Sequence, residues 1–411
     1  MPPKSRSEDP AETPPTTTYC TILSGNYLAK AVTLAGSLDR PHPGTDLVVL
    51  VIDALHDDAL PEADGVRLVS LSFLGLPDRQ MLQLPAIYGL VEFATAVKPL
   101  LLKRLFEDTE QAVYLDPDTY VTAPMEELPR DLRASEHGIL LTPHFLEPVA
   151  EGAELSEGHL LNVGVFNLGF CAVDRRAVDF LDWWWGHLET ECLWDPLSGL
   201  FVDQKWVDIG AVLFHGTAWQ HPGYNTSVAN LHERPIVRDD TGRYTIGAGG
   251  VPLRLFHFHA FDTSRPDELS TRFAHSTAHL RMDSKAVDAL CAEYATELIA
   301  NEKALGPARG YPFNVDTRGR RISQQLRRVY RLQSEGRSTP LPSPFVPAEA
   351  DAFEAWRRSA WKSIGRELLG DAAKSVRLAL PEEYGRMKAR FPGLADKVRG
   401  KTVRASGIWS G

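Results

Sequence analysis

Two carboxylates stand close together directly after a short apolar run. Asp116 and Asp118 flank Pro117 and follow residues 112–115, which are all apolar or aromatic. In an extended segment, side chains two positions apart point the same way, so these two can bind one divalent cation or its water shell. Asp and Pro also dominate turns, so a purely structural turn is the alternative. The spacing therefore predicts either a cation site or a turn.

The same segment is compatible with a second chemistry. An apolar run followed by Asp-x-Asp-Thr, as in residues 116–119, also opens the haloacid-dehalogenase-like phosphatases, where the first Asp is a nucleophile and the second an acid or base. Those phosphatases usually have Thr or Val where this chain has Tyr120, and they need a later apolar strand that ends in paired acids. Asp239 and Asp240 follow only a weak strand pattern, so this function is kept as an alternative.

Two histidines alternate with aromatic residues further along the chain. Strand alternation over residues 253–259 places His257 and His259 on one face and Phe256 and Phe258 on the other. A histidine added to two carboxylates favours Mn²⁺ over Mg²⁺, because imidazole raises the affinity for transition metals. The alternative for each histidine is a hydrogen-bonded place in the core.

Polar residues interrupt two further apolar segments. Asn167 and Gly169 lie inside the run 163–173, where a glycine often marks a bulge or the close approach of a ligand, and Asn offers both a donor and an acceptor. Asp203 and Gln204 stand near the start of a helical stretch, a position that capping alone also favours for Asp. Both pairs are candidate site residues with a local structural alternative.

The elements that must position these residues alternate between strands and helices. Continuous apolar runs indicate strands covered on both faces, as in a mostly parallel sheet flanked by helices, so the predicted fold class is α/β. The predicted strands are 19–24, 46–53, 112–115, 138–142, 163–173 and 253–258. The predicted helices are 27–38, 99–106, 177–189 and 201–209, and the pattern is mostly helical from residue 272 onward. Open α/β sheets bind ligands at the carboxyl ends of their strands, where residues 116–118 are expected.

Composition and charge narrow the classes of function. The 411 residues include 44 basic and 54 acidic side chains, and an acidic balance argues against nucleic acid as a partner. Four cysteines without a Cys-x-x-Cys pair favour a reducing cytoplasm. Residues 1–18, rich in Pro, Ser and Thr, are expected to be a disordered leader. Neither a signal peptide nor a run of 18 apolar residues is found, so export and membrane spanning are not expected.

Taken in order, the motifs resemble those of a known family. Residues 114–118 (YLDPD), 166–169 (FNLG), 203–204 (DQ) and 257–258 (HF) match the succession in glycogenin-like and bacterial lipopolysaccharide-type sugar transferases of the GT-A fold. Further similar pieces are 141–144 (LTPH) and 223–225 (GYN). The resemblance covers roughly residues 19 to 335 and implies a Rossmann-like, nucleotide-sugar-binding GT-A sheet with a helical C-terminal extension.

The resemblance also implies roles for individual residues. Asp116, Asp118 and His257 would bind a metal, Mn²⁺ or Mg²⁺, that bridges the two phosphates of the donor, and Asp203 and Gln204 would lie at the reacting centre. Residues implied to contact the donor or acceptor are Ser24, Gly25, Asn26, Asp53, Lys98, Pro117, His144, Asn167 and Gly169. The family commonly has Arg where this chain has Lys98. The lysine ammonium is a point charge and cannot make the bidentate contact of an arginine guanidinium.

The implied activity is transfer of a sugar from a nucleoside-diphosphate sugar, with UDP-sugar favoured, to an acceptor hydroxyl with retention of the anomeric configuration. The acceptor would be a glycan, a lipid-linked glycan or a small molecule. A non-catalytic binding or scaffolding protein on the same fold is the alternative from a different class. The expected domains are the catalytic domain 19–280, a helical extension 281–339, a linker 340–347 and a basic helical tail 348–411.

The tail carries a charge opposite to that of the rest of the chain. Residues 317–411 hold 20 Lys and Arg against 9 Asp and Glu, whereas the preceding residues hold 24 against 45. A stripe of apolar residues at helical spacing runs through the tail, namely Phe353, Trp356, Ala360, Ile364 and Leu368. Such a helix either docks on the acidic body or contacts an anionic membrane surface. In the second case the protein is peripheral at the inner face of the membrane.

Overall fold

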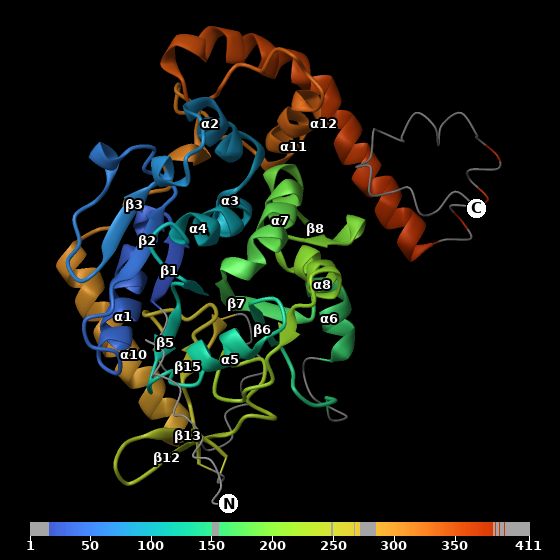
Figure 1. Cartoon of the computed structure of the whole chain (residues 1–411). Coiled ribbons are helices and arrows are strands. Elements are labelled where there is room, and N and C mark those ends of the chain that lie inside the picture. The colour runs from blue at the N-terminus through green and yellow to red at the C-terminus, as the bar shows by residue number, and fades with distance from the viewer. Residues whose placement is uncertain are drawn as a thin grey trace, which may run out of the picture.

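A seven-stranded mixed sheet forms the centre of the protein (Figure 1). The structure is a computed structural model, and it describes residues 16–149, 156–247, 250–266, 268–271, 285–380, 383, 386 and 390. The strand order is β10-β6-β7-β4-β1-β2-β3. The bounds are β1 Thr17–Leu23, β2 Leu47–Val51, β3 Arg67–Ser70, β4 Gln111–Leu115, β6 Ile139–Pro143, β7 Phe166–Asp174 and β10 Thr217–Ala218. Only β7 runs antiparallel to its neighbours. The predicted α/β class is confirmed.

The sheet is buried on both faces, which explains the continuous apolar runs. In β2, Val48 and Leu50 belong to one hydrophobic cluster, whereas Leu47, Val49 and Val51 belong to another. Successive strand side chains point to opposite faces, so both sets must be apolar when helices cover both sides. Helices α2, α3, α4, α7 and α8 contribute to the first cluster, and α1 and α5 contribute to the second.

The helices lie between the strands and after them (Figure 1). Their bounds are α1 Leu28–Asp39, α2 Asp78–Ile87, α3 Leu90–Ala96, α4 Lys98–Leu105, α5 Leu128–Ala134, α6 Glu157–Val163, α7 Val178–Glu191, α8 Gln204–Leu213, α10 Lys285–Leu305, α11 Gln324–Ser334 and α12 Ala350–Ala379. The short 3-10 turns are η1 Gly25–Tyr27, η2 Asp57–Ala59, η3 Leu71–Leu74, η4 Arg175–Ala177, η5 Pro196–Ser198, η7 Pro312–Asn314 and η8 Pro347–Glu349.

Three small sheets complete the fold. The first joins β11 (Thr226–Ser227), β15 (Leu255–His257) and β5 (Thr119–Val121) in that order. The second contains β12 (Ile236–Arg238), β13 (Tyr244–Ile246) and β14 (Val251–Pro252), and the third pairs β8 (Trp194–Asp195) with β9 (Leu200–Phe201). The first of these matters most here, because β5 follows directly on the 116–118 turn.

Two predicted elements begin three residues later than expected. The strand predicted over 163–173 begins only at Phe166, because Val163 ends α6 and Gly164 follows with a φ of 118°. The helix predicted over 201–209 begins at Gln204, because Phe201 pairs in β9 and Val202 has a φ of 40°. Apolar content alone does not distinguish a buried strand from a neighbouring helical turn.

The C-terminal helices pack beside α2. In α12, Phe353, Trp356 and Ala360 are buried, and α12 lies against α11, which in turn contacts α2. This half of the apolar stripe predicted in the tail therefore docks on the body, while Leu368 is exposed. Across the described residues, no helix is both long enough and apolar enough to cross a membrane.

Candidate functional site

The predicted site residues converge on one edge of the central sheet. The parallel strands β1, β2 and β4 end there, and the antiparallel strand β7 begins there. The backbone N–H of Asp116 donates to the carbonyl oxygen of Gly169 at 2.9 Å, which ties the end of β4 to β7. The backbone N–H of His144, just after β6, donates to the carbonyl oxygen of Val165 at 2.9 Å, which ties the next strand end to the same place.

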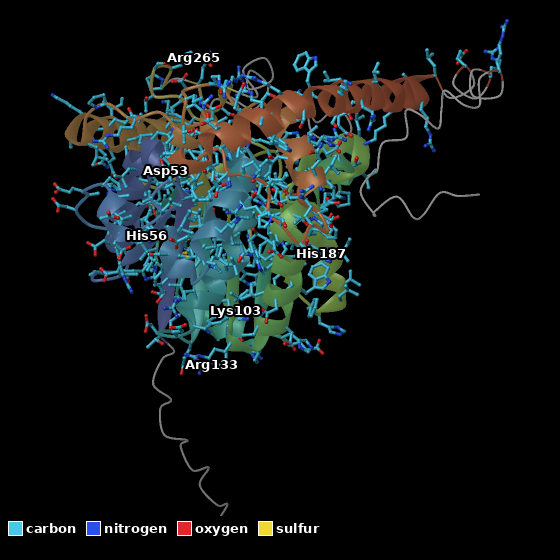
Figure 2. The ribbon with its side chains drawn as sticks, turned by 90° about the horizontal axis from the view of Figure 1, so that it is seen from above. Asp53, His56, Lys103, Arg133, His187 and Arg265 are labelled. Atoms are coloured by element: carbon cyan, nitrogen blue, oxygen red, sulfur yellow. The ribbon has the colours of Figure 1, made fainter. Side chains whose placement is uncertain are left out.

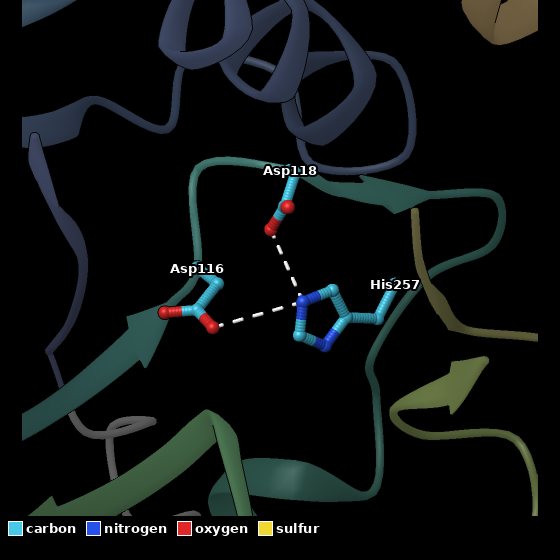
Figure 3. Close-up of side chains that lie close together, drawn as sticks. All are labelled: Asp116, Asp118 and His257. Atoms are coloured by element: carbon cyan, nitrogen blue, oxygen red, sulfur yellow. Dashed lines mark ion pairs between the residues drawn. The ribbon is translucent and has the colours of Figure 1, made fainter. Parts of the chain in front are cut away.

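A second pairing brings His257 to the carboxylates. Strand β15 pairs antiparallel with β5, and the register places His257 opposite Thr119. The N–H of Phe258 donates to the carbonyl oxygen of Asp118 at 2.8 Å, and the hydroxyl of Thr119 donates to the carbonyl oxygen of Asp116 at 2.8 Å. The turn that holds Pro117 is therefore anchored on both sides, and its two carboxylates point toward the imidazole (Figure 3).

The three side chains form a compact cluster. His257 Nε2 lies 3.1 Å from Asp118 Oδ1 and 3.7 Å from Asp116 Oδ2 (Figure 3). One donor atom from each residue lies within 4.8 Å of the other two. The imidazole is buried, whereas the carboxylates keep 28% and 20% of their side-chain surface exposed. One small cation that enters from the exposed side can therefore contact all three.

Charges in the cluster depend on one another. Burial opposes a charged imidazole, but the charge and hydrogen bond of Asp118 and the charge of Asp116 outweigh it and raise the pKa of His257. Burial likewise opposes a charged Asp118, and His257 outweighs it and lowers the pKa of that carboxyl well below its usual range. Burial raises the pKa of Asp116, against the charges of Lys98 and His257. The imidazole and the two carboxylates therefore shift one another's pKa values.

Asn225 orients the imidazole. Its side-chain nitrogen donates to Thr142 Oγ1 at 2.9 Å and to the carbonyl oxygen of Asn167 at 2.8 Å, so its oxygen faces His257 Nδ1 at 3.1 Å. Because Nδ1 must donate to that oxygen, Nε2 is the nitrogen left for the carboxylates or a metal. The sequence showed Asn225 only as part of the GYN piece of the resemblance, and no role was predicted for it.

Lys98 and Asp203 form a buried ion pair. Lys98 Nζ lies 2.7 Å from Asp203 Oδ2 and also donates to the carbonyl oxygen of Leu168 at 3.1 Å. Both side chains are 2% exposed. Burial opposes the charged lysine, but the attraction of Asp203 outweighs it and raises the pKa of Lys98. Tyr114 links this pair to the cluster, because Lys98 lies over its ring and its hydroxyl donates to Asp116 Oδ1 at 2.8 Å.

Gly169 allows the imidazole to approach β7. A Cβ added there would lie 2.5 Å from both Cε1 and Nδ1 of His257, well inside van der Waals contact. The close approach expected at this glycine is therefore made by a side chain of the cluster. Asn167 supports the same segment of β7, because its side-chain oxygen accepts a hydrogen bond from the N–H of Gly169 at 3.0 Å.

His144 and Gln204 lie together beside the cluster. Gln204 Nε2 donates to the carbonyl oxygen of Val163 at 3.0 Å and lies 3.5 Å from His144 Nε2. Burial, with smaller contributions from His159 and His257, lowers the pKa of His144 to about 3. His144 is therefore a neutral imidazole at neutral pH. One of its ring nitrogens donates a hydrogen bond and the other accepts one.

The ends of β1 and β2 form the other side of the edge. The N–H of Gly25 donates to Asp53 Oδ1 at 2.8 Å, and the hydroxyl of Ser24 donates to the side-chain oxygen of Asn26. Burial raises the pKa of Asp53, although the hydrogen bond from Gly25 opposes it. Ser24, Gly25 and Asn26 follow β1, which pairs with β4, and Asp53 follows β2, which pairs with β1. They therefore lie at the same edge of the sheet as the cluster.

The paired acids of the phosphatase alternative lie elsewhere. Asp239 and Asp240 follow β12, which belongs to a three-stranded sheet separate from the sheet that carries Asp116. Asp239 accepts hydrogen bonds from Thr241 and Arg243 and so closes its own hairpin turn. The second acidic pair that such a phosphatase needs beside its nucleophile is therefore not formed by these residues.

Comparisons with known proteins find similarities of low sequence identity. No family model matches the chain. The uncharacterized protein YfnF of Bacillus subtilis (strain 168) is 26% identical over 302 residues, which cover 71% of this chain and 96% of YfnF. Among solved structures, the galactosyltransferase LgtC in complex with donor and acceptor sugar analogs is similar with 18% identity and a TM-score of 0.38, over 71% of this chain and 99% of LgtC.

The bifunctional glycosyltransferase WbbM, in its apo form, is similar with 15% identity and a TM-score of 0.35. The match covers 54% of this chain and 41% of the WbbM chain, so the protein spans less than half of that relative. The structures to which the chain is similar are thus glycosyltransferases, the class that the motifs resemble. TM-scores below 0.5 leave substrate and mechanism to be argued from the side chains of the site.

Proposed function

We propose that the protein is a metal-dependent glycosyltransferase that moves a sugar from a nucleoside-diphosphate sugar to an acceptor hydroxyl. The observation that carries the proposal is the cluster of Asp116, Asp118 and His257 at the carboxyl edge of the parallel strands. Ligands of open α/β sheets bind at this edge. The four motifs that resemble sugar transferases all contribute side chains there, and UDP-sugar is the donor that the resemblance favours.

The three side chains fit a divalent cation. They offer two carboxylates and one imidazole nitrogen. His257 Nε2 lies 3.1 Å from Asp118 Oδ1 and 3.7 Å from Asp116 Oδ2, and both distances are below the roughly 4.2 Å that two bonds of about 2.1 Å to a shared ion can span. Asn225 orients the imidazole, as partners of metal-bound histidines generally do. One nitrogen among oxygen ligands favours Mn²⁺ over Mg²⁺. A bound cation would supply positive charge to the diphosphate of the leaving nucleotide.

The remaining residues would bind and orient the two substrates. Gly25, Asn26 and Asp53 offer N–H, amide and carboxylate groups for the nucleoside beside the cluster. Asp203 is buried and paired with Lys98, so its role would be to hold the geometry of the sugar site rather than to accept a proton freely. Gln204 would supply an amide beside the sugar. Precise orientation of the reacting groups is a large part of the catalysis expected at such a site.

Retention of the anomeric configuration is part of the proposal. An inverting enzyme needs a base positioned on the acceptor hydroxyl. Among the predicted site residues, Asp203 is engaged by Lys98 and His144 is a neutral imidazole beside Gln204. His144 is thus the side chain that an inverting mechanism would use. Proton NMR of the first product, recorded before the anomers equilibrate, distinguishes the two outcomes.

The central experiment is Asp118→Asn, which keeps the size of the side chain and removes its charge. With a panel of nucleotide sugars and Mn²⁺, we expect sugar transfer by the wild type and a loss of at least about 10²-fold in the variant, typical for loss of a key electrostatic group. Titration calorimetry with Mn²⁺ alone should show weaker binding. Asp64→Asn, at an exposed position distant in sequence, is the matched control and should leave both unchanged.

The alternatives give different results in the same experiment. A non-catalytic scaffold would bind a nucleotide sugar without turnover of any donor. A phosphatase would release phosphate from simple phosphomonoesters with Mg²⁺ and without a nucleotide sugar. Undiminished transfer by Asp118→Asn, or by the wild type in excess EDTA, would show that the cation cluster is not the catalytic centre.

A further inference from the structure

Helix α12 has two different apolar faces. Its inner face holds Phe353, Trp356 and Ala360, which are buried beside α11. Its outer face holds Trp361, whose surface is 75% exposed, together with Leu368 and Leu369 at 49% and 64%. Positions separated by seven and eight residues lie on one side of a helix, so these three form a single stripe. The stripe predicted from the sequence combined the inner residues with Leu368, and only the packing of α12 separates the inner face from the outer one.

Beyond the first two turns of α12 the exposed charges are all basic, whereas the acids Asp351 and Glu354 near its start are ion-paired. Between residues 358 and 377, the exposed charged side chains are Arg358, Lys362, Arg366 and Arg377. The two acids of the same stretch, Glu367 and Asp371, turn inward to Arg328, at 3.2 Å and 2.9 Å. A protein with a formal net charge of −10 therefore presents one helix face on which aromatic and aliphatic side chains alternate with basic ones.

An apolar side chain of η5 is also exposed beside α12. Lys374 of α12 donates to Ser198 Oγ in η5 at 3.0 Å, and the adjacent Leu197 is exposed. Figure 2 shows α12 running along one edge of the molecule, with its C-terminal part projecting past the body. The outer face is thus open to a large, flat partner.

We propose that the outer face of α12 docks on an anionic lipid surface. Trp and Leu beside Lys and Arg on one helix face are what binding in the headgroup region requires, with the helix lying along the surface. Each Lys or Arg near an anionic bilayer strengthens binding about fivefold. The segment that follows α12 is a poor occupant, because residues 381–411 hold seven Lys and Arg against three Asp and Glu and would be repelled by the same charges.

Docking there also specifies the acceptor. If the proposed sugar transfer holds, an enzyme held at a lipid surface would act on an acceptor carried by a membrane lipid, a class with high local concentration at that surface. This step rests on the proposed function. The lipid contact itself does not, because none of its residues belongs to the cation cluster.

Vesicle sedimentation of the full chain tests the contact. Phosphatidylcholine vesicles with and without phosphatidylglycerol would be used, at low and at high salt. The wild type should bind only the anionic vesicles and should be released by salt. Lys362→Gln with Arg366→Gln should weaken binding roughly thirtyfold, about fivefold for each charge. A serine variant, Trp361→Ser with Leu368→Ser and Leu369→Ser, should weaken it at least as much, because the apolar insertion is lost.

Matched controls change similar groups elsewhere. Arg243→Gln removes an exposed charge from a hairpin, and Ile299→Ser removes an exposed apolar side chain from α10, so both should bind like the wild type. Deletion of residues 348–411 is avoided, since it would uncover the pocket of Phe353 and Trp356. Equal binding by the wild type and both α12 variants would overturn the proposal.

Two other results would also overturn it. Salt-independent binding to neutral vesicles would mean that the basic residues have no part in the contact. A dimer in light scattering that the serine variant dissociates, without vesicle binding by the wild type, would assign the face to a second copy. Asp118→Asn changes the cation cluster and leaves α12 unchanged. Loss of sugar transfer with retained vesicle binding in this variant would therefore separate the proposed catalysis from the proposed lipid contact.

Discussion

Gly169→Ala perturbs the cation cluster without changing any of its ligands. The added Cβ would lie 2.5 Å from two ring atoms of His257, whereas ordinary contacts begin at 3.4 Å. The imidazole must therefore retreat by about 1 Å, because the packed interior offers little slack. Gly169 is not among the residues with a positive φ, so the backbone itself accepts alanine. The strain is expected to fall on the ring, at about 1–3 kcal/mol of folding stability.

A ring shift of that size should be measurable in binding and in rate. His257 would leave its position 3.1 Å from both Asn225 and Asp118. Loss of such orientation typically costs 10- to 100-fold in metal affinity, and a misplacement of about 1 Å can cost about 10²-fold in rate. Titration calorimetry with Mn²⁺ measures the first effect, and kcat/KM for sugar transfer measures the second.

Two comparisons make the test specific. Gly186→Ala in α7 adds a Cβ that meets nothing within 4 Å and should leave Mn²⁺ affinity unchanged. In a His257→Ala background, Gly169→Ala should cost nothing further in affinity, because the side chain with which it collides is gone. A folded Gly169→Ala protein with wild-type Mn²⁺ affinity would refute the reasoning, as would fully additive losses in the double variant.

Two further predictions concern stability. Lys98→Met leaves the Asp203 carboxylate buried without its partner, and it should lower the free energy of unfolding, measured by urea denaturation, by about 3–5 kcal/mol. Adding Asp203→Leu should restore part of that loss. A cost below about 1 kcal/mol for Lys98→Met would contradict a buried pair. The pKa of His144 is lowered from 6.5 to about 3 in the folded protein. Below pH 6.5 the unfolded chain therefore binds a proton at His144 that the folded protein does not bind, so the stability falls as the pH falls. Between pH 6.5 and 5 the wild type should lose up to about 2 kcal/mol that His144→Asn does not lose, and parallel pH profiles of the two proteins would count against this account.

The sequence predicted the strands and the motifs at their ends because both leave local signals. Residues 47–51 are apolar without interruption, and only a strand covered on both faces requires this. Asp116 and Asp118 follow such a run, and general knowledge of α/β sheets places ligands there. The roles assigned to individual site residues by resemblance stay predictions, and the experiments above are what test them.

Partners that are distant in the chain left no such signal. Asn225 contacts His257 only because β11 and β15 pair, and Lys98 meets Asp203 only because α4 and the start of α8 approach the same edge. A lone Asn in a loop or Lys at a helix start has many local explanations. The resemblance implied Lys98 as a contact of the donor or acceptor, whereas the fold engages it in an ion pair with Asp203.

The sequence by itself determined which residues could be buried, which elements they form and which side chains carry metal-binding chemistry, because each of these depends on residue type and short-range period. Only the tertiary structure decided that His257 meets the two carboxylates, since strand pairing across more than a hundred residues sets that distance. It likewise decided which face of α12 is covered. A helical period shows that a stripe exists, but packing against α11 selects the inner one and leaves Trp361 outside.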